Sequence, residues 1–203
     1  MTSESRRTEW DKRHSAGDFE GIGPNPTLVG AVSGLAAGRA VELGSGSGTN
    51  AVWLAGAGWT VTAVDWSEVG LANGAGKAAA AGVSVEWLRR NLLEWSPPAS
   101  SFELAVIVYL HLPPDERRPV YASAAAAIAP GGRLVIVGHD RLNFTEGEGG
   151  PPDQERLFTA GELARELTAT DPGLTIERAE MVRRVPSPGR GPIDALLVLR
   201  RIR

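Results

Sequence analysis

Short runs of Val, Ile and Leu that alternate with helix-length segments are the feature that most constrains the fold of this chain. Strands buried on both faces are continuously apolar, so such runs predict a mostly parallel sheet covered by helices. Strands are predicted at 39–43, 59–64, 83–88, 102–108 and 133–137. Helices are predicted at 49–57, 67–81 and 114–128. This order is typical of a doubly wound α/β fold.

The last third of the chain breaks this rhythm. One helix is predicted over 159–167, followed by strands near 174–182 and 193–199. The segment Pro186–Pro192 that joins these strands is too short for a parallel crossover, which needs a dozen or more residues. The last strand is therefore predicted to be antiparallel. The Gly- and Pro-rich stretch Asn143–Asp153 is predicted to be a mobile surface loop near the ligand-binding end of the sheet.

Composition excludes several classes of function. The chain has 203 residues, which suits one domain, and its 21 basic and 24 acidic residues argue against a general nucleic-acid binder. The absence of cysteine excludes disulfides, thiolate nucleophiles and cysteine-based zinc sites. The charged segment Met1–Arg13 lacks the apolar stretch of a signal peptide, and the longest apolar run, Leu104–Leu110, is too short to span a bilayer. A soluble, cytoplasmic protein is expected.

Glycines follow the first predicted strand in the pattern G-x-G-x-G over Gly44–Gly48. Glycine lets the backbone turn tightly and approach a ligand, and the next helix presents free amides at its start. A turn without a ligand is the alternative. Asp65 ends the second strand, where an acidic side chain can bind ribose hydroxyls. A helix N-cap is its alternative role, but Ser67 fits the cap better and would leave Asp65 free.

Glu42 and Thr49 argue against a dinucleotide. The pattern G-x-G-x-x-G would need glycine where Thr49 stands. A carboxylate directly before the loop, at Glu42, would repel a pyrophosphate and suits an ammonium or sulfonium group. These residues favour an adenosine-containing ligand with a cationic group, and an NAD-dependent reductase is a less favoured alternative.

The segment Glu42–Gly48, followed by Val64-Asp65, resembles motifs I and II of class I S-adenosylmethionine-dependent methyltransferases. Trp10–Arg13 and Pro24–Pro26 resemble the small branch that includes the tellurite-resistance and thiopurine methyltransferases. Later family motifs are matched in order at 90–92, 102–106 and 129–135. The likeness therefore spans most of the chain.

The resemblance implies a Rossmann-like, seven-stranded, mostly parallel sheet with an antiparallel last strand and helices on both faces. It implies a single domain over 1–203 whose residues 1–37 form an N-terminal helical lid. The implied reaction is methyl transfer from S-adenosylmethionine, without a metal, to a small-molecule O, N, S or chalcogen nucleophile. Neither a nucleic acid nor a membrane is expected as a partner, and the oligomeric state is left open. A regulatory protein that binds S-adenosylmethionine or S-adenosylhomocysteine without turnover is an alternative.

The resemblance also implies which residues bind the cofactor. Glu42 would hold the methionyl ammonium, and Asp65 would bind the ribose hydroxyls. Trp66 would pack on adenine, with Asn91 and Leu92 at the adenine edge. The other implied cofactor residues are Trp10, Gly44, Ser45, Gly46, Asn50 and Val108.

Two of these positions depart from the family pattern. Ser45 stands where many relatives have Cys, which is expected to be harmless because the backbone does the binding. Asn91 stands where many have Asp, and its amide oxygen is expected to give weaker adenine binding. Trp66 has ordinary packing over the sheet edge as an alternative role.

Candidate catalytic residues follow the fourth and fifth predicted strands. Tyr109 and His111 follow the fourth strand, and His139 follows the fifth. Histidine acts as a general base near neutral pH. Asp140 could orient His139, although adjacent side chains on an extended segment point apart. Packing beneath the loop is the alternative for Tyr109 and His111, and a thiolate acceptor would need no base.

For four further residues, a location or a role is predicted from their positions in the sequence alone. His14 is expected at the surface. Arg141, Arg183 and Arg184 could attract an anionic acceptor, or they could be solvated charges at strand ends.

Overall fold

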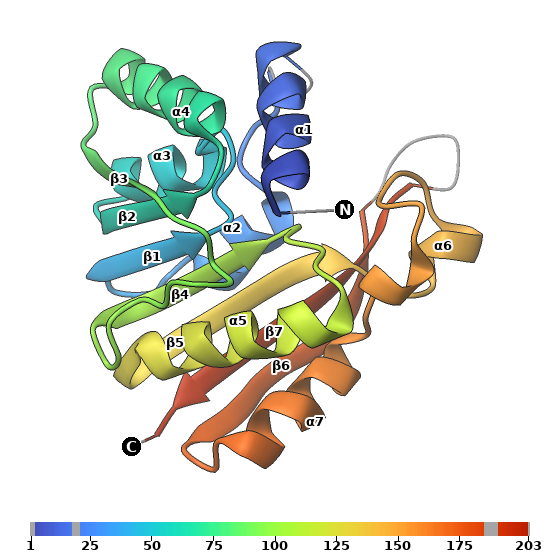
Figure 1. The fold of residues 1–203 in the computed structure, drawn as a ribbon. Helices are drawn as coiled ribbons and strands as arrows, with labels where there is room; N and C mark the ends of the chain where they lie inside the picture. The colour runs from blue at the N-terminus through green and yellow to red at the C-terminus, as the bar shows by residue number, and fades with distance from the viewer. Residues whose placement is uncertain (1–2, 18–20, 185–190, 203) are drawn as a thin grey trace. The chain divides into compact units, whose positions relative to one another are not determined.

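A computed structural model describes residues 3–17, 21–184 and 191–202 of the chain. The backbone falls into two compact units, Met1–Ser96 and Pro97–Arg203 (Figure 1). Residues 1–2 and 18–20 of the predicted lid lie outside the described residues, as do residues 186–190 of the predicted connection Pro186–Pro192.

The first unit contains a parallel sheet whose strands lie in the order β3-β2-β1. Arg39 of β1 lies opposite Thr60 of β2, and Val61 of β2 lies opposite Val85 of β3. The strands are β1 (Arg39–Leu43), β2 (Thr60–Asp65) and β3 (Val85–Arg89). The helices are α1 (Ser3–Ser15), α2 (Pro26–Val32), α3 (Thr49–Gly56) and α4 (Glu68–Ala81).

Continuously apolar strands form the core of this unit, as their sequences predict. The fully buried side chains of β1 and β2 include Val41, Leu43, Ala63 and Val64. Helices α3 and α4 pack on each other and against β2 and β3 (Figure 1). Ser67 is the N-cap of α4, and its hydroxyl accepts a hydrogen bond from the Gly70 amide at 3.0 Å. The end of β2 is thereby joined to α4 by a two-residue turn.

The second unit contains a mixed sheet with the strand order β4-β5-β7-β6. Strands β4 and β5 are parallel, whereas β7 is antiparallel to both β5 and β6. The prediction of an antiparallel last strand is therefore confirmed. The strands are β4 (Phe102–Val108), β5 (Ile128–His139), β6 (Leu174–Arg183) and β7 (Ile193–Arg201). The helices are α5 (Pro114–Ala127), α6 (Asn143–Glu146), η1 (Gln154–Arg156) and α7 (Ala160–Thr170).

Strand β5 begins at Ile128, earlier than the predicted start at residue 133, and so includes Pro130–Gly132. Gly131 has a φ of +84°, and a Cβ at Gly132 would lie 2.9 Å from the carbonyl oxygen of Glu103. The β4–β5 register shifts between Phe102 and Leu104. The glycines therefore make an irregularity inside the strand instead of ending it.

Helix α5 packs on β4 and β5, and α7 packs on β6 and β7 (Figure 1). Helix α7 begins with a capping box, in which the Thr159 hydroxyl accepts the Glu162 amide and the Glu162 carboxylate accepts the Thr159 amide. None of the helices in the described ranges is long and apolar enough to cross a membrane.

Candidate active site

Three glycines with left-handed backbone form the loop between β1 and α3. The φ angles are 73° at Gly44, 52° at Gly46 and 67° at Gly48. Only glycine adopts this region without a steric penalty. The amides of Gly44 and Ser45 donate to the Val64 carbonyl at 2.8 and 3.0 Å. The loop is thereby fastened to the end of β2.

Glu42, the last polar residue before this loop, is 1% exposed. Its Oε1 accepts the Asn50 side-chain amide at 2.9 Å, and the Asn50 oxygen accepts the Asn25 backbone amide at 2.9 Å. Its Oε2 is buried without a hydrogen-bond partner among the described residues. Burial raises the pKa of the Glu42 carboxyl from 4.5 to about 7, although hydrogen bonds from Asn50 and the Ala51 backbone oppose the shift. An orphaned carboxylate oxygen of this kind suits an ammonium group.

Asp65 is not free, contrary to the sequence interpretation. It is 8% exposed, its Oδ2 accepts the Gly46 amide at 2.8 Å, and its Oδ1 accepts the Ser67 amide at 2.8 Å. Burial raises the pKa of the Asp65 carboxyl, and these backbone hydrogen bonds oppose the shift. Ser67 is the N-cap as predicted, but Asp65 also fixes the local backbone. Each carboxylate oxygen keeps lone-pair capacity for a further donor.

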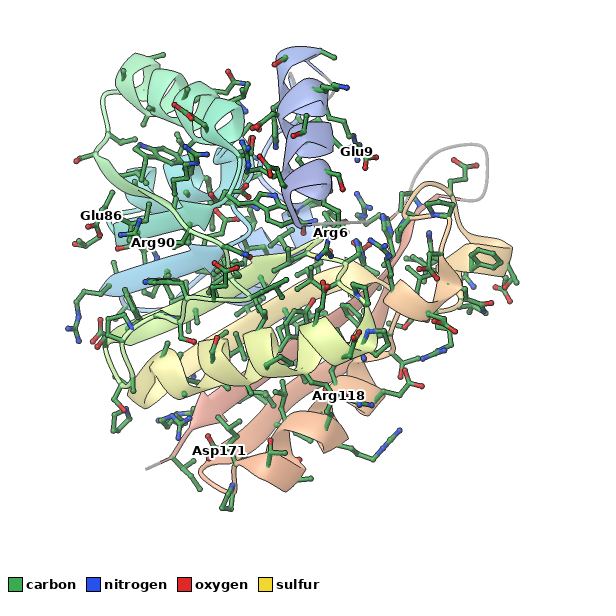
Figure 2. The ribbon with its side chains drawn as sticks, in the orientation of Figure 1. Arg6, Glu9, Glu86, Arg90, Arg118 and Asp171 are labelled. Carbon is green, nitrogen blue, oxygen red and sulfur yellow. The ribbon has the colours of Figure 1, made fainter. Side chains whose placement is uncertain are left out.

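A cavity of about 470 Å³ lies beside Trp66, a volume typical of small-molecule sites. Arg6 on α1 places its guanidinium 5.7 Å from the Trp66 ring, and Figure 2 labels both Arg6 and Arg90. The Asn91 side-chain oxygen accepts the Leu93 amide at 3.1 Å, so it already serves the local turn. The lining residues are Glu4, Arg7, Trp66, Arg89, Arg90 and Asn91.

His14 lies in the interior of the first unit, so the expectation of a surface position is wrong. It is 6% exposed, and its ring lies 3.3 Å from where a Cβ of Gly46 would be. Helix α1 reaches this position through polar contacts: the Ser67 hydroxyl donates to Asp11 at 2.6 Å, and the Asn73 amide donates to the His14 carbonyl at 3.1 Å. Burial lowers the pKa of His14, while Asp65 and Asp11 oppose the shift.

Three other predicted cofactor residues occupy different settings. Trp10 is 38% exposed, with the Arg13 guanidinium 4.6 Å from its ring and the His14 ring 6.1 Å away. Leu92 is half-buried. Val108 is buried in the second unit, at the end of β4 opposite Val137.

The end of β4 continues into a backbone conformation that is unusual for a side-chain-bearing residue. Tyr109 has a φ of +56°. Its amide donates to the Val137 carbonyl at 2.8 Å, and its hydroxyl donates to Asp194 Oδ2 at 2.9 Å. A strained backbone conformation of this kind persists where surrounding contacts stabilise it, and the two hydrogen bonds of Tyr109 are such contacts.

His111 has a structural hydrogen bond that limits it as a base. Its Nε2 accepts the backbone amide of His139 at 2.9 Å. Burial lowers the pKa of His111 to about 3. The lone pair that would take an acceptor proton is therefore already occupied within the second unit.

His139 faces Asp194 and not its sequence neighbour. Its Nδ1 lies 3.6 Å from Asp194 Oδ1, and Arg184 forms an ion pair with the same carboxylate, Nε to Oδ2, at 2.8 Å. Burial and the nearby Arg184 lower the pKa of His139 to about 4, so its imidazole is neutral at pH 7. Asp140 instead accepts the Leu142 amide at 2.9 Å.

The three arginines considered for an anionic acceptor are all paired with carboxylates. Arg141 lies 3.0 Å from Glu162, and Arg183 lies 2.6 Å from Glu146. Arg184 is paired with Asp194 as described above. None of these three guanidinium groups is therefore an unpaired charge.

The segment 143–153 is anchored at its start, so the prediction of a surface loop is only partly correct. Asn143 is 2% exposed; its side chain accepts the Ile193 amide at 2.8 Å and donates to the Gly149 carbonyl at 2.9 Å. A Cβ at Gly150 would lie 2.8 Å from Cδ2 of His139. The loop therefore lies directly against the His139 ring.

Residues 40–132 match a family model described as a methyltransferase domain. This part of the chain is therefore similar to a methyltransferase domain. Comparison of the sequence with curated proteins finds no relative. Within the described ranges, the chain has no group of three or more His, Asp or Glu residues placed to hold a metal ion.

Several solved structures share the fold over most of the chain. The 1,6-didemethyltoxoflavin-N1-methyltransferase of Burkholderia thailandensis, solved with S-adenosylhomocysteine, has a TM-score of 0.70 at 22% identity over 97% of this chain and 87% of its own. A Methanosarcina mazei S-adenosylmethionine-dependent methyltransferase has a TM-score of 0.68 at 19% identity over 89% and 99%. TehB from Haemophilus influenzae has a TM-score of 0.68 at 15% identity over 94% and 66%.

These likenesses confirm the predicted fold class, a Rossmann-like, seven-stranded, mostly parallel sheet with an antiparallel last strand and flanking helices. Together with the family model over residues 40–132, they support the predicted resemblance to the class I S-adenosylmethionine-dependent methyltransferases.

Sequence reasoning missed two features of the candidate site. Asp194 is fully buried between Tyr109, His139 and Arg184. A signal was present, since Asp194 is the only charged residue in the apolar run 193–199. The arginines of α1 and β3 beside Trp66 had no such signal, because charged residues at helix and strand ends are common.

Replacing Asp65 with alanine is expected to lower both cofactor affinity and stability. Alanine would leave the Gly46 and Ser67 amides without their acceptors, which should cost about 1–2 kcal/mol of unfolding free energy. Urea unfolding and titration with S-adenosylhomocysteine measure the two effects. Glu68→Ala, which removes an exposed carboxylate paired with Arg89, is the matched control. An Asp65→Ala variant of unchanged stability would contradict the anchoring role of this carboxylate.

Proposed function

We propose that this protein transfers a methyl group to a small-molecule nucleophile and that it binds S-adenosylmethionine through the glycine loop of the first unit. The observation that carries the cofactor assignment is Oε2 of Glu42, a buried carboxylate oxygen without a hydrogen-bond partner in the described chain. An ammonium group would satisfy it. When bound, the cofactor supplies a methyl group on a sulfonium sulfur, which is already an activated leaving group.

In this proposal the rest of the cofactor contacts the residues that surround the loop. The left-handed glycines Gly44 and Gly46, with Ser45 between them, would pass their backbone against the cofactor. Asn50 keeps Glu42 in place. Asp65 would use its remaining lone pairs for the ribose hydroxyls.

The adenine is proposed to occupy the cavity beside Trp66, with Asn91 and Leu92 at its edge. The cavity volume of about 470 Å³ is ample for a purine. Because Asn91 already accepts the Leu93 amide, it has one lone pair left for the adenine amino group. Trp10, on the exposed face of α1, stays a predicted cofactor contact.

A small-molecule acceptor is supported by the toxoflavin methyltransferase, whose structure contains its small-molecule substrate and which covers 97% of this chain. Tyr109, His111 and His139 stay the proposed catalytic residues, with His139 as the base because Nε2 of His111 already accepts the His139 amide. Val108 is proposed to line the methyl site. A single domain over 1–203, a lid over 1–37 and a cytoplasmic location also belong to this proposal.

The proposal is tested by incubating the protein with S-adenosylmethionine carrying an isotopically labelled methyl group and a cell extract. The extract is separated by ultrafiltration into small-molecule and macromolecule fractions. Label is expected in the small-molecule fraction, and labelling confined to macromolecules would contradict the proposal. Glu42→Gln is expected to lose the transfer, whereas Glu86→Gln, which alters an exposed glutamate on β3 (Figure 2), is expected to keep it.

A further inference from the structure

Asp194 is a fully buried carboxylate at the start of β7, directly opposite His139 in the antiparallel pair with β5. Directly opposite residues of an antiparallel pair place their side chains on the same face of the sheet. Three side chains converge on its two oxygens. The Tyr109 hydroxyl donates to Oδ2 at 2.9 Å, Arg184 Nε lies 2.8 Å from Oδ2, and His139 Nδ1 lies 3.6 Å from Oδ1.

Arg184 and Tyr109 favour the charged form of Asp194. Burial raises the pKa of the Asp194 carboxyl, whereas the guanidinium and the phenol hydroxyl lower it. A buried carboxylate with such partners is stable only while those partners stay in place. The position of the Asp194 side chain is therefore fixed before any ligand binds.

The ring of His139 is held on several sides. The Tyr109 ring stacks on it at 4.8 Å and an interplanar angle of 27°, and the His111 ring stacks at 5.3 Å and 7°. Gly150 lies against Cδ2, where a Cβ would be 2.8 Å away. Nδ1 is buried without a hydrogen-bond partner among the described residues, and Asp194 Oδ1 lies 3.6 Å from it, as an ion-pair partner and not at hydrogen-bond distance. Nε2 is then the ring nitrogen available to a ligand.

We infer that His139, oriented by Asp194, takes the proton from an acceptor whose nucleophilic atom arrives protonated, a hydroxyl or N–H group and not a thiolate. This inference rests on the proposed function. The acceptor proton passes to Nε2, and the electron pair it leaves forms the bond to the methyl carbon. The sulfonium sulfur keeps the electron pair of the broken C–S bond, and the imidazolium returns its proton to solvent.

Asp194 acts through His139 and is a positioning residue. With Nδ1–H directed at the carboxylate, the lone pair of the neutral imidazole is on Nε2, which is the tautomer a base needs. The same carboxylate stabilises the imidazolium once the proton has arrived. The charged and titratable groups that face His139 are Tyr109 and His111 after β4, Arg184 after β6, and Asp194 itself.

The tautomer of His139 is measured by NMR of the full chain labelled with ¹⁵N-histidine. The chain has three histidines, so the spectrum contains signals from three imidazole rings. We expect His139 to be neutral at pH 7 and protonated on Nδ1. Asp194→Asn removes the negative charge that faces Nδ1, so the ring proton of His139 is expected to move to Nε2. His111 should stay protonated on Nδ1, because its Nε2 accepts the His139 amide.

The spectrum of the unaltered protein shows which ring nitrogen of His139 carries the proton, even if the Asp194→Asn variant does not fold. A His139 protonated on Nε2 in that spectrum would overturn the inference. So would a folded Asp194→Asn variant in which the His139 signals do not change.

The acceptor class is tested with His139→Gln on the small-molecule fraction labelled by the unaltered enzyme. The rate of transfer is expected to fall roughly 10²- to 10⁴-fold, while the affinity for S-adenosylhomocysteine is unchanged. Transfer at an undiminished rate would show that no base is needed and would overturn the inference. An unaltered protein that does not bind S-adenosylhomocysteine would instead contradict the proposed function, and the NMR result would still stand.

Discussion

Replacing Glu42 with glutamine is expected to make the cofactor-free protein more stable at pH 8 and, at the same time, to weaken cofactor binding. Both effects come from one buried carboxyl group whose pKa is raised from 4.5 to about 7. The folded protein therefore holds a proton that the unfolded chain has already released between these two pH values. By linkage, the free energy of unfolding falls as pH rises through this window and is constant above it.

The size of the stabilisation follows from the shift. Ionising Glu42 in the folded protein at pH 8 costs about 3 kcal/mol, because each pKa unit is worth about 1.4 kcal/mol. Glutamine keeps the hydrogen bond with Asn50 but leaves a buried NH₂ without an acceptor, which costs about 1 kcal/mol. A net gain of about 2 kcal/mol corresponds to a Tm higher by about 4–8 °C. The gain should vanish at about pH 5, where the cost of ionising Glu42 has fallen to the same value of about 1 kcal/mol.

Cofactor affinity should change in the opposite direction. The carboxylate–ammonium contact is worth about 1.5–3 kcal/mol, so Glu42→Gln should bind S-adenosylhomocysteine roughly 10- to 150-fold more weakly at pH 8. In the unaltered protein the affinity should fall about tenfold from pH 8 to pH 6, since the carboxyl must release its proton first. Glu42→Gln should lack this pH dependence. Calorimetry and thermal unfolding at both pH values check these results.

Two outcomes would contradict this account of Glu42. One is a Glu42→Gln variant that is less stable than the unaltered protein at pH 8, because Glu42 would then be ionised without cost. The other is unchanged affinity for S-adenosylhomocysteine. Glu86→Gln, at the exposed glutamate of β3, is the matched control and is expected to change neither quantity.

A second large effect is expected at Gly48, the last glycine of the loop. Its φ is +67°, and a Cβ there would lie 2.3 Å from the Trp87 ring. Gly82, which ends α4, has the same φ of +67° but nothing within 4 Å of its Cβ position. Gly82→Ala should cost about 1–2 kcal/mol for the left-handed backbone alone. Gly48→Ala should cost about 3–5 kcal/mol, because the overpacking against Trp87 adds to the same backbone term.

Urea unfolding of the two variants measures the difference, and titration with S-adenosylhomocysteine should show weaker binding in Gly48→Ala alone. In a Trp87→Leu background, Gly48→Ala is expected to cost no more than Gly82→Ala. Equal costs for the two glycine variants in the presence of Trp87 would contradict the packing described here.

Much of the fold was predictable because its signals are local. The apolar runs fix the strands of both units, and Ser67 fixes the start of α4 through a hydrogen bond three residues along the chain. The short connection after β6 dictates an antiparallel β7. The start of strand β5 was harder to predict. Two adjacent glycines, Gly131 and Gly132, are typical of a turn, but here they form an irregularity within a strand.

The candidate site was predictable only in part, because its decisive contacts are not local. Two hydrogen bonds hold α1 so that His14 is buried, one from the Ser67 hydroxyl to Asp11 and one from the Asn73 amide to the His14 carbonyl. The sequence of α1 has no apolar stripe that would predict this burial. The pairing of His139 with Asp194 depends on the antiparallel register of β5 and β7, which no local pattern specifies.

The central claim is that the glycine loop and Glu42 bind S-adenosylmethionine. The most direct test is calorimetric titration of the unaltered protein at pH 8 with S-adenosylhomocysteine and, separately, with NADH. The account predicts binding of one equivalent of S-adenosylhomocysteine and none of NADH. Binding of NADH without binding of S-adenosylhomocysteine would contradict it.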